Sequence, residues 1–506
     1  DYGNIKVSDS SLSKPVKFRF NVGTAAVGIR NIGIRSRSPL FIKVLWSGED
    51  NNDDFQKLLV DGTNFTTFSK NFNANFQSTD LTFGPEIMYM RDLNDGNPSV
   101  LRLEYCQNLM ELDLAGNQFL KLLVLTGTTS LRNLNLSHCT KLGTALSDDE
   151  ASAEGTTQSD IDLSLCTNLQ SVDISYTGLS QLKLPSGGTL KSLICNNSGL
   201  QKMELYNQSF LESVDFTNCT NLTSIVVTNC ENLKSINLTN ASLSTFKASN
   251  CPNLEEVILD GNIRLRSVSF SSTDKLKRLS LVGCNNNSLG FYSGDEVKDN
   301  ETALNLLGCP NLEELDLTRC SAQVIYFNGD CTSLKKLKCD QSSIKQTIIG
   351  GKSDGTTQKH FSYLGSKPAF DLINFTLDTI EMTNCTSLIN VINIKPSTVL
   401  SFKGCSFLER ITGNLVFTGT VSNTFYQCTK FTLQNYSGKN PRSLISSDWD
   451  LNIDMTNCTA LNSVFHGSGV TLNDVIWITR RIGNVRQLNT TFYSCPNIIT
   501  NSSTPL

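Results

Sequence analysis

The sequence predicts a mainly β solenoid in which short parallel strands stack from coils of about 21 residues. One phrase, apolar-x-x-apolar-x-apolar, returns between Leu190 and Leu281 in steps of ten or eleven residues. Apolar residues two apart are typical of a strand, and the i, i+3, i+4, i+7 spacing of a helix is absent there. A repeat this regular indicates that successive coils stack around one continuous core.

The residue that follows the first leucine of each phrase indicates how many phrases make up one coil. On alternate phrases these residues switch between Lys and Glu, and on the remaining phrases most are neutral. The charged set is Lys191, Glu212, Lys234, Glu255 and Lys277, and the other set is Ser180, Gln201, Thr223, Ser244 and Arg266. Two phrases therefore form one coil with two parallel sheets, and stacked neighbours of opposite sign attract. We interpret this charge ladder mainly as a device that fixes strand register, with a ligand site as the alternative.

Residues 1–98 lack the phrase and are predicted to form a small antiparallel β-sandwich that caps the solenoid. Runs such as KFRFNV and LFIKVLW have strand length and lie between clusters of Gly, Asn, Asp and Ser. A cap is expected here because an open first coil would expose apolar core. The acidic run Gly48–Asp54 fits a solvated loop better than a cation site, since its spacing differs from that of a calcium loop.

Residues 99–350 are predicted to form the regular leucine-rich solenoid, with polar insertions near 143–165 and 285–303 as surface loops. From 351 to 506 the phrase degrades to units such as MTNCTSL and FKGCSFL. This segment is predicted to be a less regular continuation that ends in a C-terminal cap. Within it, Thr471–Gly483 has apolar residues at helical spacing.

Most of the 17 cysteines hold one position of the repeat, three residues after the last apolar residue of a phrase. Asn117 and Asn262 hold the same position in other units. A position shared by Cys and Asn indicates a buried turn, where a thiol acts as a small apolar group with a weak donor and an amide bonds the backbone. No C-x-x-C pair occurs, so we favour structural thiols over disulfides or metal sites.

Composition and motifs argue against several classes of function. The net charge of −4 and the lack of a long basic run predict no nucleic-acid partner, and no apolar run reaches the length of a transmembrane segment. G-x-S-x-G, H-E-x-x-H, Walker and G-x-G-x-x-G motifs are absent, so no enzyme activity, cofactor or metal site is expected. His138 and His466 fall at turn positions and are expected to be packed or solvated. The adjacent glutamates of Glu255–Glu256 and Glu313–Glu314 are expected to point to opposite faces of a strand.

The L-x-x-L-x-L-x-x-[NC] phrase resembles that of leucine-rich repeat proteins. The segment Leu190–Phe216, LKSLICNNSGLQKMELYNQSFLESVDF, is similar to the 21-residue cysteine-containing repeat of internalin J-like bacterial surface proteins. The later F-x-x-C-x-x-L units resemble BspA-like leucine-rich repeat proteins, in which a sandwich segment with a W-G-D-G-like turn precedes the repeats. The turn here is WSGED, Trp46–Asp50. The resemblance implies a non-catalytic protein that is exported to the cell surface and binds proteins or host components.

The sequence therefore predicts an exported bacterial protein, secreted or attached to the cell surface or outer membrane, that binds a protein or glycan partner. The alternative is an accessory scaffold subunit, expected to be a lipoprotein, of a larger outer-membrane or particle assembly. The chain opens without a leader, which fits a mature or trimmed form. The candidate binding face consists of outward positions on three phrases: Lys191, Ser192, Ile194, Glu212, Ser213, Asp215, Lys234, Ser235 and Asn237.

Overall fold

The structure, a computed structural model, describes residues 109–146, 161–284, 304–350, 360–433 and 451–498, with short gaps in all but the second range. Between residues 16 and 102 it describes only the backbone of the strands. The chain divides into two compact parts, Asp1–Ser242 and Leu243–Leu506. The insertions predicted near 143–165 and 285–303 lie mostly outside the described residues, as does the acidic run Gly48–Asp54.

Antiparallel strands come before the repeats in the described backbone. They are β1 (Val16–Asn21), β2 (Gly28–Arg35), β3 (Leu40–Trp46), β4 (Gln56–Val60), β5 (Thr66–Phe72), β6 (Ser78–Phe83), β7 (Tyr89–Asp92) and β8 (Pro98–Arg102). β1 pairs with β6 and β8, β2 with β5 and β7, and β3 with β4 and β6. β7 and β8 then pair in parallel with the first repeat strands, β9 (Glu111–Asp113) and β10 (Leu122–Val124). That these strands close into a sandwich cap stays a prediction.

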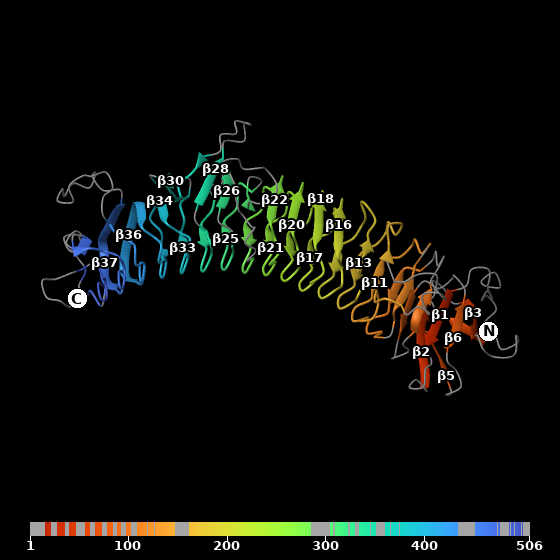
Figure 1. Cartoon of the computed structure of the whole chain (residues 1–506). Coiled ribbons are helices and arrows are strands. Elements are labelled where there is room, and N and C mark those ends of the chain that lie inside the picture. Colours follow the sequence, from red (N-terminus) through yellow and green to blue (C-terminus); the bar gives the residue numbers. More distant parts are fainter. Residues whose placement is uncertain are drawn as a thin grey trace. The chain divides into compact units, whose positions relative to one another are not determined.

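The repeat strands of the first part lie on two sides of the coils. One side holds the parallel sheet of β9, β11 (Asn133–Asn135), β13 (Ser171–Asp173), β15 (Ser192–Ile194), β17 (Ser213–Asp215) and β19 (Ser235–Asn237), here called the ladder sheet. The other side holds β12 (Ile161–Asp162), β14 (Leu182–Lys183), β16 (Lys202–Tyr206) and β18 (Ser224–Thr228). Successive phrases thus alternate between the sides, which confirms that two phrases make one coil (Figure 1).

The register of these strands gives the coil length. Ser171 pairs with Ser192, and Ser213 pairs with Ser235, so partners lie 21 or 22 positions apart. Both pairings are parallel and run without an insertion. The chain is therefore the mainly β, parallel solenoid that the phrase predicts, with coils close to the expected length.

The second part has the same arrangement of strands. Its ladder sheet holds β21 (Glu256–Ile258), β23 (Arg278–Ser280), β25 (Glu314–Asp316), β27 (Lys336–Lys338), β33 (Thr379–Glu381) and β35 (Val399–Ser401). The opposite sheet holds β20 (Thr245–Ser249), β22 (Ser267–Ser271), β24 (Leu304–Asn305), β26 (Val324–Asn328), β28 (Gln346–Gly350) and β29 (His360–Phe361), of which β29 is antiparallel to its neighbour.

Toward its end the second part becomes less regular. A hairpin of β30 (Tyr363–Leu364) and β31 (Lys367–Pro368) precedes a parallel sheet of β32 (Phe370–Asp371), β34 (Asn390–Ile394), β36 (Arg410–Ser422) and β37 (Leu451–Asn462). The last two strands are much longer than those of the regular coils (Figure 1). Val475 N donates to Thr471 O at 3.0 Å in a helical contact at the start of the segment predicted to have helical spacing, and residues 476–483 of that segment lie outside the described residues.

The core lies between the two sides of the coil and follows the strand period. In β16, Met203 and Leu205 are buried, while Lys202, Glu204 and Tyr206 point outward. A fully buried leucine or methionine contributes about 1.5–3 kcal/mol, so each coil adds several such contributions to stability. In the less regular segment, phenylalanine rings fill the same space and stack from coil to coil. The stacked pairs include Phe402–Phe425 and Phe425–Phe465, with ring centroids 5.9 Å and 5.4 Å apart.

A residue in the left-handed backbone region turns the chain at many coil corners. Asn197, Asn218 and Asn240 have φ of 57°, 59° and 57°. Asparagine tolerates this conformation better than most residues because its short amide bonds locally. These amides also form a ladder, since Asn218 Nδ2 donates to Asn197 Oδ1 at 3.2 Å and Asn240 Nδ2 donates to Asn218 Oδ1 at 3.0 Å. Side-chain hydrogen bonds therefore link each of these corners to the corner of the neighbouring coil.

The residue after each corner is the position shared by cysteine and asparagine, and it is buried. All the cysteines in the described part of the chain are buried free thiols. Cys139 Sγ donates to Leu114 O of the preceding coil at 3.1 Å, and Asn117 Nδ2 donates to the same oxygen at 2.8 Å. This confirms that the thiols act as small apolar groups with a weak donor, in a turn position that an amide can also fill.

Candidate binding face

The residues predicted as a binding face all lie on or beside three neighbouring strands of the ladder sheet in the first part, β15, β17 and β19. Their side chains are exposed or half-buried, whereas Leu193, Val214 and Ile236 between them are buried. Alternation along each strand explains this difference, because successive side chains point to opposite faces. The structure therefore brings the nine predicted residues onto one outward surface, here called the ladder face. That the ladder face binds a partner stays a prediction.

An ion pair joins two of these residues across neighbouring coils. Lys234 Nζ lies 2.8 Å from Glu212 Oε2, and both side chains are more than half exposed. The hydrogen bond from Lys234 holds the pKa of Glu212 below its ordinary value. The backbone repeats the contact, since Lys234 N donates to Glu212 O at 2.8 Å. Because both charges remain in contact with water, the pair favours one register more than it stabilises the fold.

Two members of the ladder face are engaged in turns at the ends of their strands. Asp215 Oδ1 accepts hydrogen bonds from Thr217 N at 2.9 Å and from Thr217 Oγ1 at 2.5 Å. Asn237 Oδ1 accepts from Thr239 N at 3.1 Å and from Thr239 Oγ1 at 2.7 Å. These are Asx turns, which the sequence analysis did not foresee at these positions. Asp215 and Asn237 therefore have a structural role that is independent of any partner.

Ile194 differs from the rest of the ladder face. It is apolar, 39% exposed, and pairs in register with Asp173 on one side and Asp215 on the other. A half-exposed isoleucine between two carboxylates offers an apolar contact inside a polar surface. Together with the lysines, the glutamate and the serines of the three strands, it forms the part of the face that is open to a partner.

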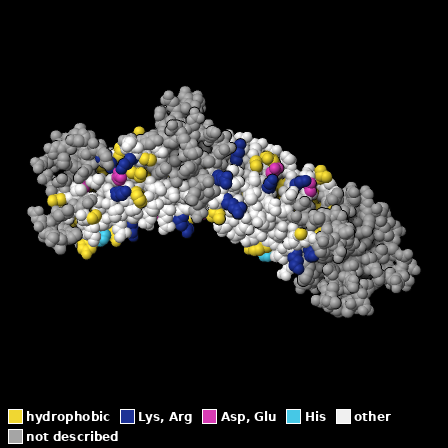
Figure 2. Space-filling view, viewed as in Figure 1, with side chains coloured by type: hydrophobic (Ala, Val, Ile, Leu, Met, Phe, Trp, Pro, Cys, Tyr) yellow, Lys and Arg dark blue, Asp and Glu magenta, His cyan; other side chains and the backbone are white. Residues whose placement is uncertain are grey.

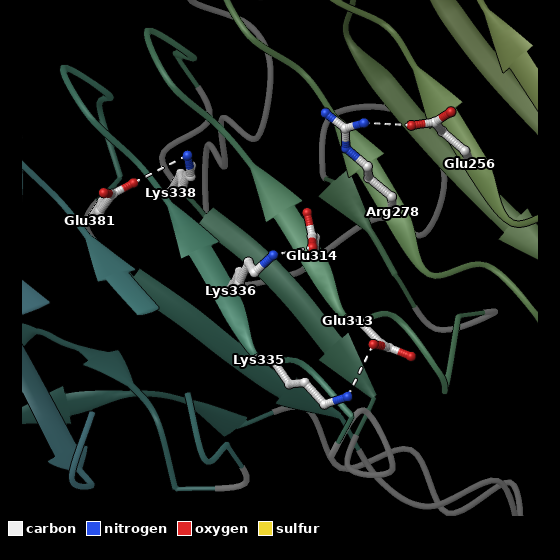
Figure 3. A network of polar contacts seen from close by, with 8 residues as sticks. All are labelled: Glu256, Arg278, Glu313, Glu314, Lys335, Lys336, Lys338 and Glu381. Atoms are coloured by element: carbon white, nitrogen blue, oxygen red, sulfur yellow. Dashed lines mark hydrogen bonds and ion pairs between the residues drawn. The ribbon is translucent and has the colours of Figure 1, made fainter. Parts of the chain in front are cut away.

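In the second part the ladder sheet carries opposite charges in two neighbouring columns and one pair in a third (Figure 3). The pairs drawn there are Glu256–Arg278 at 2.6 Å, Glu313–Lys335 at 3.1 Å, Glu314–Lys336 at 2.5 Å and Lys338–Glu381 at 3.3 Å. A further pair joins Glu255 and Lys277 at 3.2 Å. The charge alternation seen in the sequence is thus a set of contacts between stacked coils.

The expectation that adjacent glutamates point to opposite faces is wrong. β21 begins at Glu256 and β25 begins at Glu314, so Glu255 and Glu313 precede their strands and do not follow the strand alternation. Both glutamates of each pair are solvent-accessible, and each has a basic partner one coil on. These carboxylates are held apart by separate cations and do not form an acid–base pair.

Both histidines singled out in the sequence stack on tyrosines at coil corners. The rings of His138 and Tyr176 are nearly parallel, with centroids 4.4 Å apart. The ring of His466 lies between Tyr426, at 4.7 Å, and Tyr493, at 5.3 Å. The expectation of packed or solvated histidines is confirmed: His466 is partly buried between the rings, and His138 stacks on Tyr176 while exposed to solvent.

The structure also contains a groove that the sequence analysis missed, on the side of the first part opposite the ladder face. It lies between β14 and β16, which are not neighbours in a sheet although their coils are consecutive. Pro185 lies two residues after the end of β14 and has no N–H to donate, so the pairing cannot extend through it, and β14 has two residues while β16 has five. The only signal in the sequence was the PSGG run of Pro185–Gly188, which resembles an ordinary turn.

Polar groups close this side groove at both ends. Gln201 N donates to Ser180 O at 3.0 Å at one end, and Gln208 Nε2 donates to Pro185 O at 2.7 Å at the other. The volume between them is about 570 Å³, which is within the usual range for small-molecule sites. The lining residues are Ser164, Ser180, Gln181, Leu182, Lys183, Leu184, Pro185, Ser186, Gln201, Lys202, Met203, Glu204, Tyr206 and Gln208.

No group of three or more His, Cys, Asp or Glu residues within the described ranges could hold a metal ion. Burial raises the pKa of the Cys166 thiol to about 11 and that of Cys428 to about 12, so these thiols stay protonated and unreactive near neutral pH. On the face drawn in Figure 2, charged side chains of both signs lie in small groups and apolar side chains are scattered.

No protein-family model matches the chain, and no curated protein matches it. Among the described residues, no helix has both the length and the apolar character needed to cross a membrane.

Proposed function

We propose that this chain is an exported leucine-rich repeat protein of the bacterial cell surface, of the internalin J-like and BspA-like kind. It binds a protein or glycan partner and has no catalytic role. The observation that supports this best is the ladder face, where regularly spaced, solvent-exposed side chains lie on stacked parallel strands. Solenoids commonly bind their partners on extended surfaces of this type.

The residues of the ladder face that serve binding are those that take no part in an Asx turn or an ion pair. Lys191, Ser192, Ile194, Ser213 and Ser235 are accessible and contribute a cation, hydroxyls and one apolar group. The Glu212–Lys234 pair adds a fixed charge pattern that a partner of complementary charge would recognise. Attachment to the outer membrane through a lipidated cysteine, or secretion, belongs to this proposal, and display on the cell surface is tested separately below.

A charge swap tests the role of the face without removing its ion pair. The double variant Glu212→Lys/Lys234→Glu keeps opposite charges at these two positions and inverts their order, and it places a like charge beside Lys191, as the control below does beside Glu314. The matched control is Glu256→Arg/Arg278→Glu in the second part, which swaps a similar pair away from the predicted face. The partner is identified by cross-linking on intact cells of the source organism and then titrated with the purified chains. Binding lost in the first variant alone supports the proposal, and binding unchanged in both variants contradicts the assignment of the face.

Location and assembly are tested on the native protein. Protease treatment of intact cells should remove the chain if it is displayed on the surface, while a cytoplasmic marker stays intact. Survival of the chain in cells whose surface proteins are digested would contradict export to the surface. Purification of the native protein in fixed stoichiometry with outer-membrane subunits would replace free partner binding by the accessory-scaffold role.

A further inference from the structure

We infer that the side groove between β14 and β16 is a carbohydrate-binding site that takes a short, neutral oligosaccharide. The inference rests on the proposed function, a surface protein that binds without catalysis, and assigns one ligand class to a site outside the ladder face.

A buried amide oxygen of a groove-lining residue lacks a donor. Gln208 is 1% exposed, and its Nε2 donates to Pro185 O at 2.7 Å and to Tyr206 O at 3.0 Å. These two carbonyl acceptors fix which end of the amide carries the hydrogens. Oε1, the other end, has no hydrogen-bond partner among the described residues. A buried acceptor without a donor is unfavourable, and this oxygen has almost no exposed surface, so a ligand hydroxyl gains affinity there once the groove lining shifts enough to admit it.

An aromatic ring lies beside this acceptor. Tyr206 ends β16, lines the groove and is 38% exposed. Carbohydrates combine hydroxyl edges with apolar faces of C–H groups, and an exposed aromatic ring offers a flat surface for such a face. Leu182 and Met203, both buried, add an apolar floor between the strands.

The remaining walls suit a neutral ligand with many hydroxyls. Ser180, Gln181 and Gln201 provide hydroxyl and amide groups that can both donate and accept, as sugar hydroxyls do. The charges of the groove are balanced rather than of one sign. Lys183 lies 3.4 Å from Asp162, and Lys202 and Glu204 both point outward from β16. No excess charge is therefore available to select an anionic or cationic ligand.

The closed ends favour a compact ligand over an extended peptide. The hydrogen bonds Gln201–Ser180 and Gln208–Pro185 leave an opening of residues 181–184, which spans about 13 Å at the usual rise of a strand. A peptide strand lying between β14 and β16 would have to break one of these bonds to extend further. A short oligosaccharide fits the opening and leaves both bonds intact.

The experiment begins with the full chain on an array of neutral and acidic oligosaccharides, followed by titration of the best soluble neutral glycan. Tyr206→Ala should weaken binding at least about tenfold, while Tyr206→Phe, which keeps the ring, should stay within about threefold. Gln181→Trp, at an exposed lining position, should abolish binding by filling the groove. Tyr176→Ala is the matched control, because Tyr176 is an exposed tyrosine of the same part outside the groove and its removal should leave affinity unchanged.

The possible outcomes separate this inference from the proposed function. Glycan binding that is indifferent to Tyr206→Ala and Gln181→Trp overturns the groove as the site and leaves the proposed function standing. Preference for acidic glycans, or a peptide that displaces the glycan from the groove, overturns the assigned ligand class. If no glycan binds, the inference fails, and the proposed function fails with it only if cell-surface cross-linking also finds no partner.

Discussion

The thiol of Cys219 lies 3.0 Å from the backbone oxygen of Cys195, one coil earlier. The same oxygen accepts the N–H of Ser198 at 3.1 Å. A carbonyl oxygen has two lone pairs, and in a dry core each unmatched polar group costs stability. The thiol therefore matches the second lone pair of a carbonyl that the turn alone leaves half satisfied. The same contact recurs at Cys284 with Leu259 O, at 3.1 Å, and at Cys428 with Phe402 O, at 2.9 Å.

Cys219→Ala should lower the free energy of unfolding by about 1–2 kcal/mol, because it removes a hydrogen bond and leaves a small cavity. Cys219→Ser should lose less, since a hydroxyl also donates and Ser198 already holds this position one coil earlier. Urea unfolding of both variants beside the wild type measures the difference. An alanine variant as stable as the wild type would show that the thiol contact contributes nothing.

Stability should decline in alkaline solution because of the buried thiols. Burial raises the pKa of Cys166 to about 11 and of Cys428 to about 12. A folded pKa above the unfolded value of about 8.5 means that the folded state holds the proton more tightly. The stabilisation is complete below about pH 8.5 and is lost as pH rises toward the folded values. The urea midpoint measured from pH 8 to pH 10.5 should therefore fall, and it should fall less in Cys166→Ala/Cys428→Ala than in the wild type.

Two glycines with similar backbones should respond differently to alanine. Gly143 has φ +86°, and a Cβ there would lie 2.5 Å from Leu179 Cα. Gly116 has φ +79°, and a Cβ there would meet no atom within 4 Å. Gly116→Ala should cost about 1–2 kcal/mol for the left-handed backbone alone, while Gly143→Ala should cost about 3 kcal/mol or more because backbone must also shift. Equal losses in thermal or urea unfolding would contradict the close approach of Gly143 to the next coil.

The ion pair between Glu256 and Arg278 should contribute little and should depend on salt. In a double-mutant cycle with Glu256→Ala and Arg278→Ala, the coupling energy should be about 0.2–1 kcal/mol at low ionic strength. It should shrink toward zero in about 1 M salt, where the screening length is about 3 Å. Coupling that persists in high salt would indicate a contact that is shielded from water, contrary to the exposure of both side chains.

Much of the fold was predictable because one physical pattern is repeated many times. The apolar phrase placed the buried side chains, and the alternation of Lys191, Glu212 and Lys234 identified which phrases stack. The shared use of one position by Cys219 and Asn262 identified a buried turn before any contact was known. In each case many equivalent positions give the same answer, so a chance match is easily recognised.

The site was less predictable because its chemistry depends on individual residues that do not recur from coil to coil. The carboxylate of Asp215 looks the same in the sequence whether it faces a partner or the N–H of Thr217. Glu255 and Glu256 share a face only because the strand begins between them. The side groove exists because Pro185 ends one strand early, and its unpartnered amide oxygen belongs to Gln208, more than twenty residues away. Such features arise where the repeat is broken, and the repeat pattern cannot foresee them.

The charge ladder also restricts how the gene can gain or lose repeats. Lys191, Glu212 and Lys234 occupy equivalent places in consecutive coils, so their signs alternate. Recombination that deletes a single coil would place Lys191 against Lys234, two like charges, whereas deletion of two coils would restore an opposite pair. The number of coils gained or lost therefore matters. A change by an even number of coils keeps opposite charges next to each other on neighbouring coils, whereas a change by an odd number places like charges together.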